Sequence, residues 1–476
     1  MKFHFWRSAL ALLASGAFLM TSCKDAENVA PVTSLSETAS DADVNKWVLD
    51  TMSTWYYWND KLPANPNLAQ DPESFFESLL YKNPSDGDRF SWIQKSADEL
   101  RSSLSGSTKT DGMEFQLYRQ PGGTNALVGS VLYVLPGSPA DKAGIKRGDL
   151  FTSLNGQPLT TTNYGDLFGS LGDVRSYGFS TVQNGQLSNT STPKQVTATV
   201  FQENPVFKDS VYTMGGKTIG YLVYNQFING PGGFDDHSYD QQVDNVFAKF
   251  KARGVNELVL DLRYNPGGSV TAAVNLASLI SPKATNSTIF ASYEYNKAFM
   301  DYIRSEGAID QLRYPFVSKA QNIGSNLQRV FVLTTGRTAS ASELVINGLK
   351  PYMNVVTIGD TTVGKNVGSQ TFYDPTGRIK WGIQPIITKI FNAKGQSDYT
   401  NGFAPNTLAF EPLNPKAFGD ITETMLGEAF YQITGSRTAR RGAVSGPVLQ
   451  EVRSSIERKA AGSNMFLPDN LPVPHK

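Results

Sequence analysis

The stretch Thr338-Ala339-Ser340-Ala341-Ser342-Glu343 joins a run of small residues to an apolar pattern that continues through Leu344, Val345, Ile346 and Leu349. Apolar residues at this spacing predict a buried helix. The first turn of a helix has backbone N–H groups without intrahelical acceptors, and the helix dipole favours negative charge there. A serine at this point therefore lies where an oxyanion can be stabilised.

A serine nucleophile also needs a base. The chain holds only 3 histidines, one in an apolar leader, one in a polar segment and one next to the C-terminus: His4, His237 and His475. A lysine serves as the base where burial lowers its pKa, and Gly364-Lys365 lies downstream of the serine run. Ser342 competes with Ser340 for the role of nucleophile, and either serine also suits a purely structural helix cap.

These motifs resemble those of the carboxy-terminal processing peptidases, the tail-specific serine–lysine proteases. The likeness rests on Ser340-Ala-Ser-Glu343, followed 25 residues after Ser340 by Lys365. It extends to Leu260-Asp-Leu-Arg-Tyr-Asn-Pro-Gly-Gly268, to Ile219-Gly-Tyr-Leu222 and to a PDZ-like segment before them, over roughly residues 45–430. Each motif alone is weak, but the combination is specific.

The resemblance implies that Ser340 is the nucleophile and that Lys365 is the general base, which takes the serine proton and returns it to the leaving amine. It also implies an oxyanion hole formed by the Ala341 N–H and an N–H of Gly267 or Gly268. The two glycines equally suit a tight strand-to-helix turn that requires positive φ. Asp261 and Arg263 are expected to shape this turn rather than to take part in catalysis.

Two features beside Lys365 depart from simple patterns. Many family members have a glutamine four residues after the lysine that orients its amine, whereas here Gln370 stands five residues after it, so Ser369 is an alternative. Gly359–Lys365 also has the Gly-x4-Gly-Lys spacing of a phosphate-binding loop. Asn366 stands where such a loop needs Ser or Thr, so we expect no nucleotide binding.

The first 22 residues predict an export signal, because a basic start precedes an apolar run too short to span a bilayer. Cys23, the only cysteine, stands where a bacterial lipobox places the residue that is lipidated. The alternative is a free thiol in a plain secretory signal. Residues 23–42 have no apolar period and predict a flexible tether. Together these features predict a protein lipid-anchored to the bacterial cell envelope, on its periplasmic face or outer surface.

The composition limits the other function classes. The chain has 476 residues, which is too long for one core, and its 43 basic and 43 acidic side chains give no net charge. This balance gives no reason to expect nucleic-acid binding. With few histidines and one cysteine, we expect no metal site, and the motifs imply no cofactor.

The residue patterns predict a multidomain protein of mixed α/β and β class. Its expected parts are a small helical N-terminal domain, a PDZ-like β domain, an α/β serine peptidase domain with a mostly parallel sheet, and a tail with a helix near 448–459. Their ranges are 43–104, 105–202, 203–435 and 436–476. Alternating strand and helix patterns place the catalytic motifs at the carboxyl ends of strands.

The order Gly-Ser-Pro-Ala140, Gly148-Asp149 and Leu-Asn155-Gly156 resembles the PDZ domain of bacterial proteases. Such a domain takes a peptide as an added strand and holds its terminal carboxylate with backbone N–H groups. By that resemblance, the carboxylate site is formed by Gly112, Met113, Glu114 and Phe115. A plain turn glycine at Gly112 is the equally weighted alternative.

The expected function is serine-type endopeptidase activity on proteins or peptides engaged through their C-terminal tails, with any regulatory partner unknown. The alternative is a non-catalytic PDZ scaffold, or a carrier of apolar ligands on the same fold, which the shifted Gln370 keeps open. The pKa of Lys365 separates the two, because a binding protein has no use for a neutral buried lysine.

Overall fold

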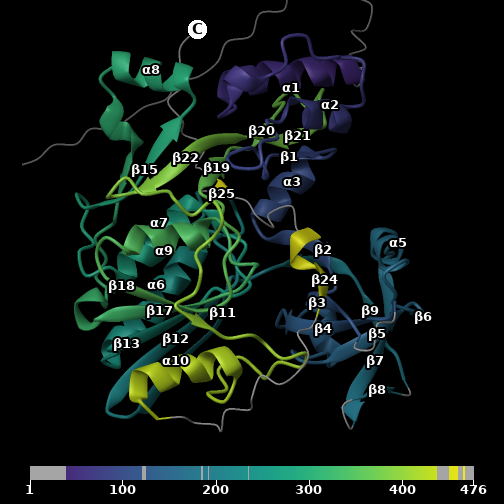
Figure 1. Cartoon of the computed structure of the whole chain (residues 1–476), viewed down its shortest axis with the longest axis vertical. Coiled ribbons are helices and arrows are strands. Elements are labelled where there is room, and N and C mark those ends of the chain that lie inside the picture. Colours follow the sequence, from purple (N-terminus) through teal and green to yellow (C-terminus); the bar gives the residue numbers. More distant parts are fainter. Residues whose placement is uncertain are drawn as a thin grey trace, which may run out of the picture. The chain divides into compact units, whose positions relative to one another are not determined.

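The computed structural model describes residues 39–120, 125–183, 186–190, 192–233, 235–436, 450–458 and 465–466 (Figure 1). The predicted signal and Cys23 lie outside these residues. Within them, no helix combines the length and the apolar character needed to cross a membrane.

The N-terminal part of the described chain is mainly helical, as predicted. Asp71 caps its second helix, because its carboxylate accepts the Ser74 N–H at 3.0 Å. Phe75 and Phe76 pack with Ile379 and Ile383 from much later in the sequence, so this core is shared with the predicted peptidase part. The elements are α1 (Asp41–Trp55), η1 (Asn59–Lys61), α2 (Pro72–Leu79), β1 (Trp92–Gln94) and α3 (Ala97–Leu104).

The predicted PDZ-like part is a sheet in the order β24-β3-β4-β5-β7-β8, covered by short helices. Asn155 (φ 51) and Gly156 (φ 77) form the hairpin turn between β5 and β6. The elements are β2 (Ser107–Thr110), β3 (Met113–Arg119), β4 (Leu127–Val134), α4 (Pro139–Lys142), β5 (Leu150–Leu154), β6 (Gln157–Pro158), α5 (Tyr164–Gly169), β7 (Val174–Gln183), β8 (Gln186–Asn189), β9 (Lys194–Thr197) and β10 (Thr199–Gln202).

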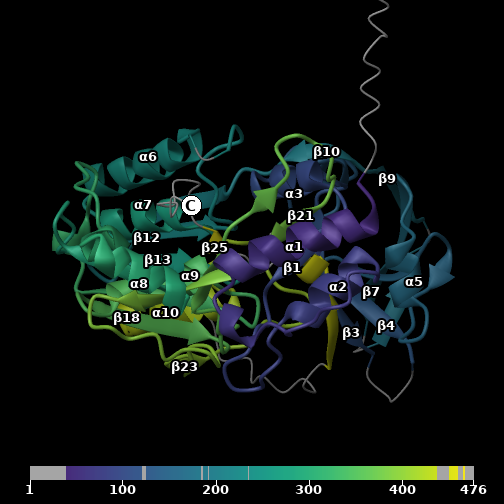
Figure 2. The same ribbon diagram turned by 90° about the horizontal axis from the view of Figure 1, so that it is seen from above.

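A two-stranded ribbon connects this part to the rest of the chain. β2 and β10 pair antiparallel, with Ser107 opposite Gln202 and Thr110 opposite Thr199. β10 is labelled beside α3 in Figure 2. The chain therefore enters and leaves the PDZ-like part through neighbouring strands.

The peptidase part is built on a mostly parallel sheet in the order β11-β12-β13-β17-β18-β23, in which the first pair alone is antiparallel. Helices α6, α7 and α9 cover one face and α10 covers the other (Figure 1). The elements are β11 (Val206–Met214), β12 (Lys217–Tyr224), α6 (Ser238–Ala252), β13 (Glu257–Asp261), α7 (Val270–Ile280), β17 (Arg329–Thr334), α9 (Ala341–Leu349), β18 (Asn354–Gly359), β23 (Thr407–Leu408) and α10 (Thr424–Thr434).

A second sheet, in the order β14-β25-β19-β22-β15-β16, joins segments from distant parts of the sequence. β20 and β21 pair with each other, and β21 also pairs with β1. The elements are β14 (Gly268–Ser269), β15 (Ile289–Tyr295), α8 (Lys297–Ser305), η2 (Ile309–Leu312), β16 (Arg313–Pro315), η3 (Gly324–Asn326), β19 (Val367–Ser369), β20 (Phe372–Tyr373), β21 (Gly382–Gln384), β22 (Ile386–Asn392) and β25 (Met465–Phe466).

The tail corrects one prediction. In place of a helix near 448–459, the chain forms β24 (Glu451–Ser454), which pairs with β3, and a single turn of 3-10 helix, η4 (Ile456–Arg458). Apolar residues four apart mimic a helix period here. The free edge of β3 supplies backbone hydrogen bonds along β24, and this tertiary contact overrides the local pattern.

Candidate active site

Ser340 precedes α9 directly and has φ 63 and ψ −115. Positive φ is uncommon outside glycine and costs on the order of 1–3 kcal/mol. The side chain is fully buried, and its Oγ has no hydrogen-bond partner among the described residues. The Ser342 hydroxyl, in contrast, donates to the Asn265 carbonyl at 3.0 Å. Of the two candidate serines, Ser340 is therefore the one whose hydroxyl does not hold the fold together.

Glu343, to which the sequence analysis gave no role, joins the two predicted catalytic residues. Its Oε2 accepts the backbone N–H groups of Ser340 and Lys365, both at 2.8 Å. Its Oε1 accepts the Gly364 N–H at 2.7 Å and the Thr362 hydroxyl at 2.5 Å. Because one oxygen binds both nitrogens, Ser340 and Lys365 are neighbours in space. The signal in the sequence is the Ser-x-x-Glu spacing of a capping box.

The carboxylate of Glu343 is itself fully buried. Burial raises its pKa, whereas the hydrogen bonds from Thr362 and from the backbone N–H groups lower it. A buried carboxylate is stable only when its lone pairs are used, as they are here. Glu343 therefore positions the site rather than reacting.

Lys365 is fully buried, and burial lowers its pKa from 10.5 to about 7, against the opposing charges of Asp88 and Glu343. Its Nζ lies 5.0 Å from the centre of the Phe90 ring. Phe90 comes from the N-terminal part of the chain, far from Lys365 in the sequence. A lysine with this pKa is mostly neutral above pH 7, as a general base must be.

The turn before Lys365 is braced from the same N-terminal part. The Arg89 guanidinium donates to the carbonyl oxygens of Gly364 and Thr400, both at 2.8 Å. Gly364 has φ 90, and a Cβ there would lie 2.2 Å from the Thr400 oxygen. The chain then enters β19, whereas a phosphate-binding loop leads into a helix. The geometry thus agrees with the expected lack of nucleotide binding.

Of the two predicted oxyanion glycines, Gly267 lies against Ser340, whereas Gly268 lies against the Phe227 backbone. A Cβ on Gly267, which has φ 108, would lie 2.6 Å from the Ser340 Cβ and 3.0 Å from the Ala341 nitrogen. The Gly267 N–H already donates to Asn265 Oδ1 at 2.9 Å. That contact favours Gly268, at the start of β14, as the glycine partner of the Ala341 N–H. The part that either glycine plays in catalysis stays a prediction.

Gln370 follows β19 directly. It is buried, as is the alternative residue Ser369. Both lie on the segment that begins at Lys365, but a role for either in orienting the lysine amine stays a prediction.

Asp261 and Arg263 form a buried ion network behind the glycine turn, in agreement with the structural role expected for them. Arg263 contacts Asp261 at 2.8 Å, Glu411 at 2.9 Å and Glu423 at 3.0 Å. Arg147, from the PDZ-like part, donates to the same Glu411 at 2.5 Å. One carboxylate therefore connects the PDZ-like part with the turn that carries Gly267.

The predicted carboxylate loop lies at the start of β3. The N–H groups of Gly112 and Met113 donate within the loop, to Thr110 Oγ1 at 2.9 Å and Asp111 Oδ1 at 3.0 Å. The Phe115 N–H donates instead to a side chain of the C-terminal tail, at 2.8 Å. The role of Gly112, Met113, Glu114 and Phe115 in binding a ligand stays a prediction.

His237 is on the surface, where its Nδ1 contacts Asp240 at 2.8 Å, as expected of a non-catalytic histidine. No group of three or more His, Cys, Asp and Glu side chains in the described ranges could hold a metal ion.

Three family models match the chain. The model described as peptidase family S41 matches residues 218–408, and the peptidase S41 N-terminal domain model matches residues 43–92. A PDZ domain model matches residues 130–171. The first match contains Ser340, Lys365 and the glycine turn.

The chain is also similar to individual proteins. The carboxyl-terminal-processing protease of Picosynechococcus sp. is 27% identical over 64% of this chain and 66% of its own length. A CtpA-like serine protease of Staphylococcus aureus is 28% identical over 58% of this chain and 52% of its own length. The chain thus spans less than two thirds of each of these relatives.

Among solved structures, a Bacteroides fragilis protein assigned to the S41 proteases is 29% identical, with a TM-score of 0.68, over 82% of this chain and 97% of its own. This likeness extends across the matched domains. Residues 218–408 and 43–92 therefore match the peptidase and N-terminal domains of peptidase family S41, and residues 130–171 match a PDZ domain.

Proposed function

We propose that the protein is a serine-type endopeptidase that cleaves proteins or peptides near their C-terminal tails with Ser340 and Lys365. The observation that carries this proposal is a buried Ser340 hydroxyl without a partner among the described residues, on a backbone that shares the Glu343 carboxylate with a fully buried lysine of pKa about 7. A carrier or scaffold on the same fold has no need for a neutral buried lysine.

In the proposed reaction, neutral Lys365 takes the hydroxyl proton as Ser340 Oγ attacks the scissile carbonyl carbon. The Ala341 N–H and a glycine N–H donate to the oxygen that becomes negative, and each such donor contributes roughly 100- to 1,000-fold in rate. The C–N bond then breaks, and Lys365 gives its proton to the leaving amine. Water hydrolyses the acyl-enzyme with the same lysine as base.

The PDZ domain supports the choice of substrate, because such domains bind extended peptides by strand addition. The substrate is proposed to be a loosely folded protein or a peptide that enters by its C-terminal tail. We also propose that Cys23 is lipidated and anchors the exported protein to the cell envelope, on the strength of the leader and the lipobox-like spacing.

The test measures cleavage of a loosely folded protein with an apolar C-terminus by mass spectrometry. Ser340→Ala and Lys365→Ala are each expected to lower the rate by at least about 1,000-fold without loss of fold. Ser342→Ala is the matched control. It should keep most of the activity but lose about 1–2 kcal/mol of stability, because the buried Asn265 carbonyl loses a donor. Cleavage that survives in Ser340→Ala would contradict the assignment.

A further inference from the structure

The chain's own tail lies in the strand-addition site of the PDZ domain. β24 pairs antiparallel with β3, with Arg453 opposite Leu117 and Ser454 opposite Gln116. The Arg119 N–H donates to the Gln450 oxygen and the Ser455 N–H donates to the Phe115 oxygen, both at 2.9 Å. This strand runs toward the loop of residues 112–115, which is the direction in which a C-terminal ligand of a PDZ domain runs.

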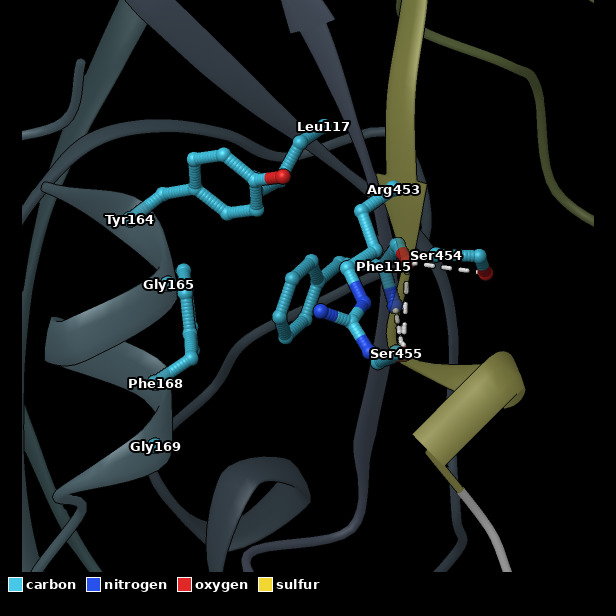
Figure 3. A pocket seen from close by; sticks show the side chains of 9 residues that line it. All are labelled: Phe115, Leu117, Tyr164, Gly165, Phe168, Gly169, Arg453, Ser454 and Ser455. Carbon is cyan, nitrogen blue, oxygen red and sulfur yellow. Dashed lines mark hydrogen bonds between the residues drawn. The ribbon is translucent and has the colours of Figure 1, made fainter. Parts of the chain in front are cut away.

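At the end of this strand, a serine hydroxyl takes the acceptor position predicted for a terminal carboxylate. The Phe115 N–H donates to Ser455 Oγ at 2.8 Å (Figure 3). The same Ser455 Oγ donates to Glu114 Oε2 at 2.5 Å. Because Glu114 stands beside this position, a neutral hydroxyl fits the present loop better than a carboxylate does. An incoming tail must therefore displace Ser455 and turn Glu114 away.

The tail fills the groove incompletely. A cavity of about 230 Å³ lies between β3 and α5, lined by Phe115 and Leu117 of β3, Tyr164 and Phe168 of α5, and Arg453, Ser454 and Ser455 of the tail (Figure 3). The tail thus offers polar side chains to an apolar wall. A ligand with an apolar side chain in this place gains apolar burial that the tail cannot supply.

Beyond the groove, the tail pairs with strands that adjoin the proposed catalytic residues in the sequence. Met465 and Phe466 form β25, whose backbone pairs in parallel with β14 and also with Ser369 of β19. β14 begins at Gly268, next to the glycine that contacts Ser340, and β19 begins two residues after Lys365. The tail backbone therefore lies between the two strands nearest the nucleophile and the base, as an extended substrate would.

A salt bridge connects the occupied groove with the nucleophile loop. The Arg337 guanidinium donates to Gln116 Oε1 on β3 and to Glu451 Oε2 on β24, the latter at 2.8 Å. Arg337 stands three residues before Ser340 in the sequence. Replacing the tail by another strand thus removes one of its two partners.

From these contacts we propose that the described tail residues, 450–458 and 465–466, are an intrachain ligand that occupies the PDZ groove and pairs with the strands next to Gly267 and Lys365, where it competes with substrate. The proposal rests on the proposed function. Because the tail is a polar and incomplete filler of the groove, substrate tails with apolar ends are expected to displace it.

The test uses the full chain on a Ser340→Ala background, with a fluorescein-labelled decapeptide that ends in Ala-Leu-Val. Ser455→Pro removes the N–H that donates to Phe115 and the hydroxyl that accepts from it, so the Kd of the peptide should fall about 10-fold. Glu457→Ala, on the exposed turn just after β24, is the control and should leave the Kd unchanged. An equal Kd in all three proteins overturns the proposal.

Hydrogen exchange provides a second measurement that needs no variant of the tail. Adding the decapeptide should speed amide exchange in residues 450–458 at least 5-fold while β3 stays protected. Peptide binding without any change in this segment overturns the proposal. Neither measurement depends on cleavage. If the protein with Ser340 intact cleaves nothing but still shows the exchange change, only the proposed function is contradicted.

Discussion

At the scale of single residues, the two proposed catalytic side chains, Ser340 and Lys365, are both buried. Ser340 has a hydroxyl with no partner in the described structure, and Lys365 has no access to water. The Glu343 carboxylate accepts four hydrogen bonds. They hold the backbones of Ser340 and Lys365 together without engaging the serine hydroxyl or the lysine amine. Glu343 thus stabilises the site, whereas Ser340 and Lys365 are the residues proposed to react.

The pKa of Lys365 predicts how the rate depends on pH. Only the neutral amine accepts the proton of Ser340, so kcat/KM should rise with pH, reach half its plateau near pH 7 and level off above pH 8. Initial rates on a fluorogenic peptide between pH 5 and 9 provide the measurement. A rate that is independent of pH over this range would be incompatible with lysine as the base.

Asp88→Asn provides a sharper version of the same experiment. The charge of Asp88 raises the pKa of Lys365, so its removal should move the acid limb of the profile to lower pH. Asp86→Asn, on the exposed surface two residues away, is the control and should leave the limb in place.

At the scale of elements, the glycine turn and α9 fit each other closely. Gly267→Ala should abolish most activity and destabilise the protein by about 3 kcal/mol or more, because its Cβ would lie 2.6 Å from the Ser340 Cβ. Gly254→Ala is the control, since Gly254 also has positive φ (65°) but nothing within 4 Å, and should cost only about 1 kcal/mol. Thermal unfolding and peptide cleavage measure the two effects, and equal losses in both variants would show that backbone strain alone is responsible.

The elements also show how much of the fold the sequence predicts. Contiguous apolar strands such as β12, β13 and β17, and the capped helix α9, were predictable because their signals are local. Glu343 carried a local signal as well, in its spacing from Ser340, but its contact with Lys365 depends on the fold. β24 and the pairing of β14 with β25 were not predictable, since each needs an edge that only the folded protein provides.

At the scale of the whole molecule, Glu411 binds arginines from two domains. These arginines, Arg147 and Arg263, lower the pKa of Glu411 from 4.5 to about 2. A depressed carboxyl pKa contributes stability above the unfolded value, and that stability is lost as the pH falls from about 4.5 toward 2. Glu411→Gln should therefore lower the free energy of unfolding by about 3 kcal/mol at pH 7 and flatten this acid decline.

Urea unfolding at pH 7, 4 and 3 measures the effect of Glu411→Gln. Glu306→Gln, on the exposed end of α8, serves as the control and should follow the parent protein at each pH. A variant that declines with acid as steeply as the parent would show that the two arginines are held by their other partners.

The paired strands β2 and β10 make the PDZ-like part an insertion whose two ends lie side by side. Because the chain departs and returns at adjacent positions, genetic recombination could exchange the intervening cassette for another while the surrounding backbone kept its path. Such an exchange would remove the pairing of β3 with β24 together with the proposed peptide-binding groove. A protein that gained a new peptide-binding domain in this way would therefore also lose the proposed competition by its own tail.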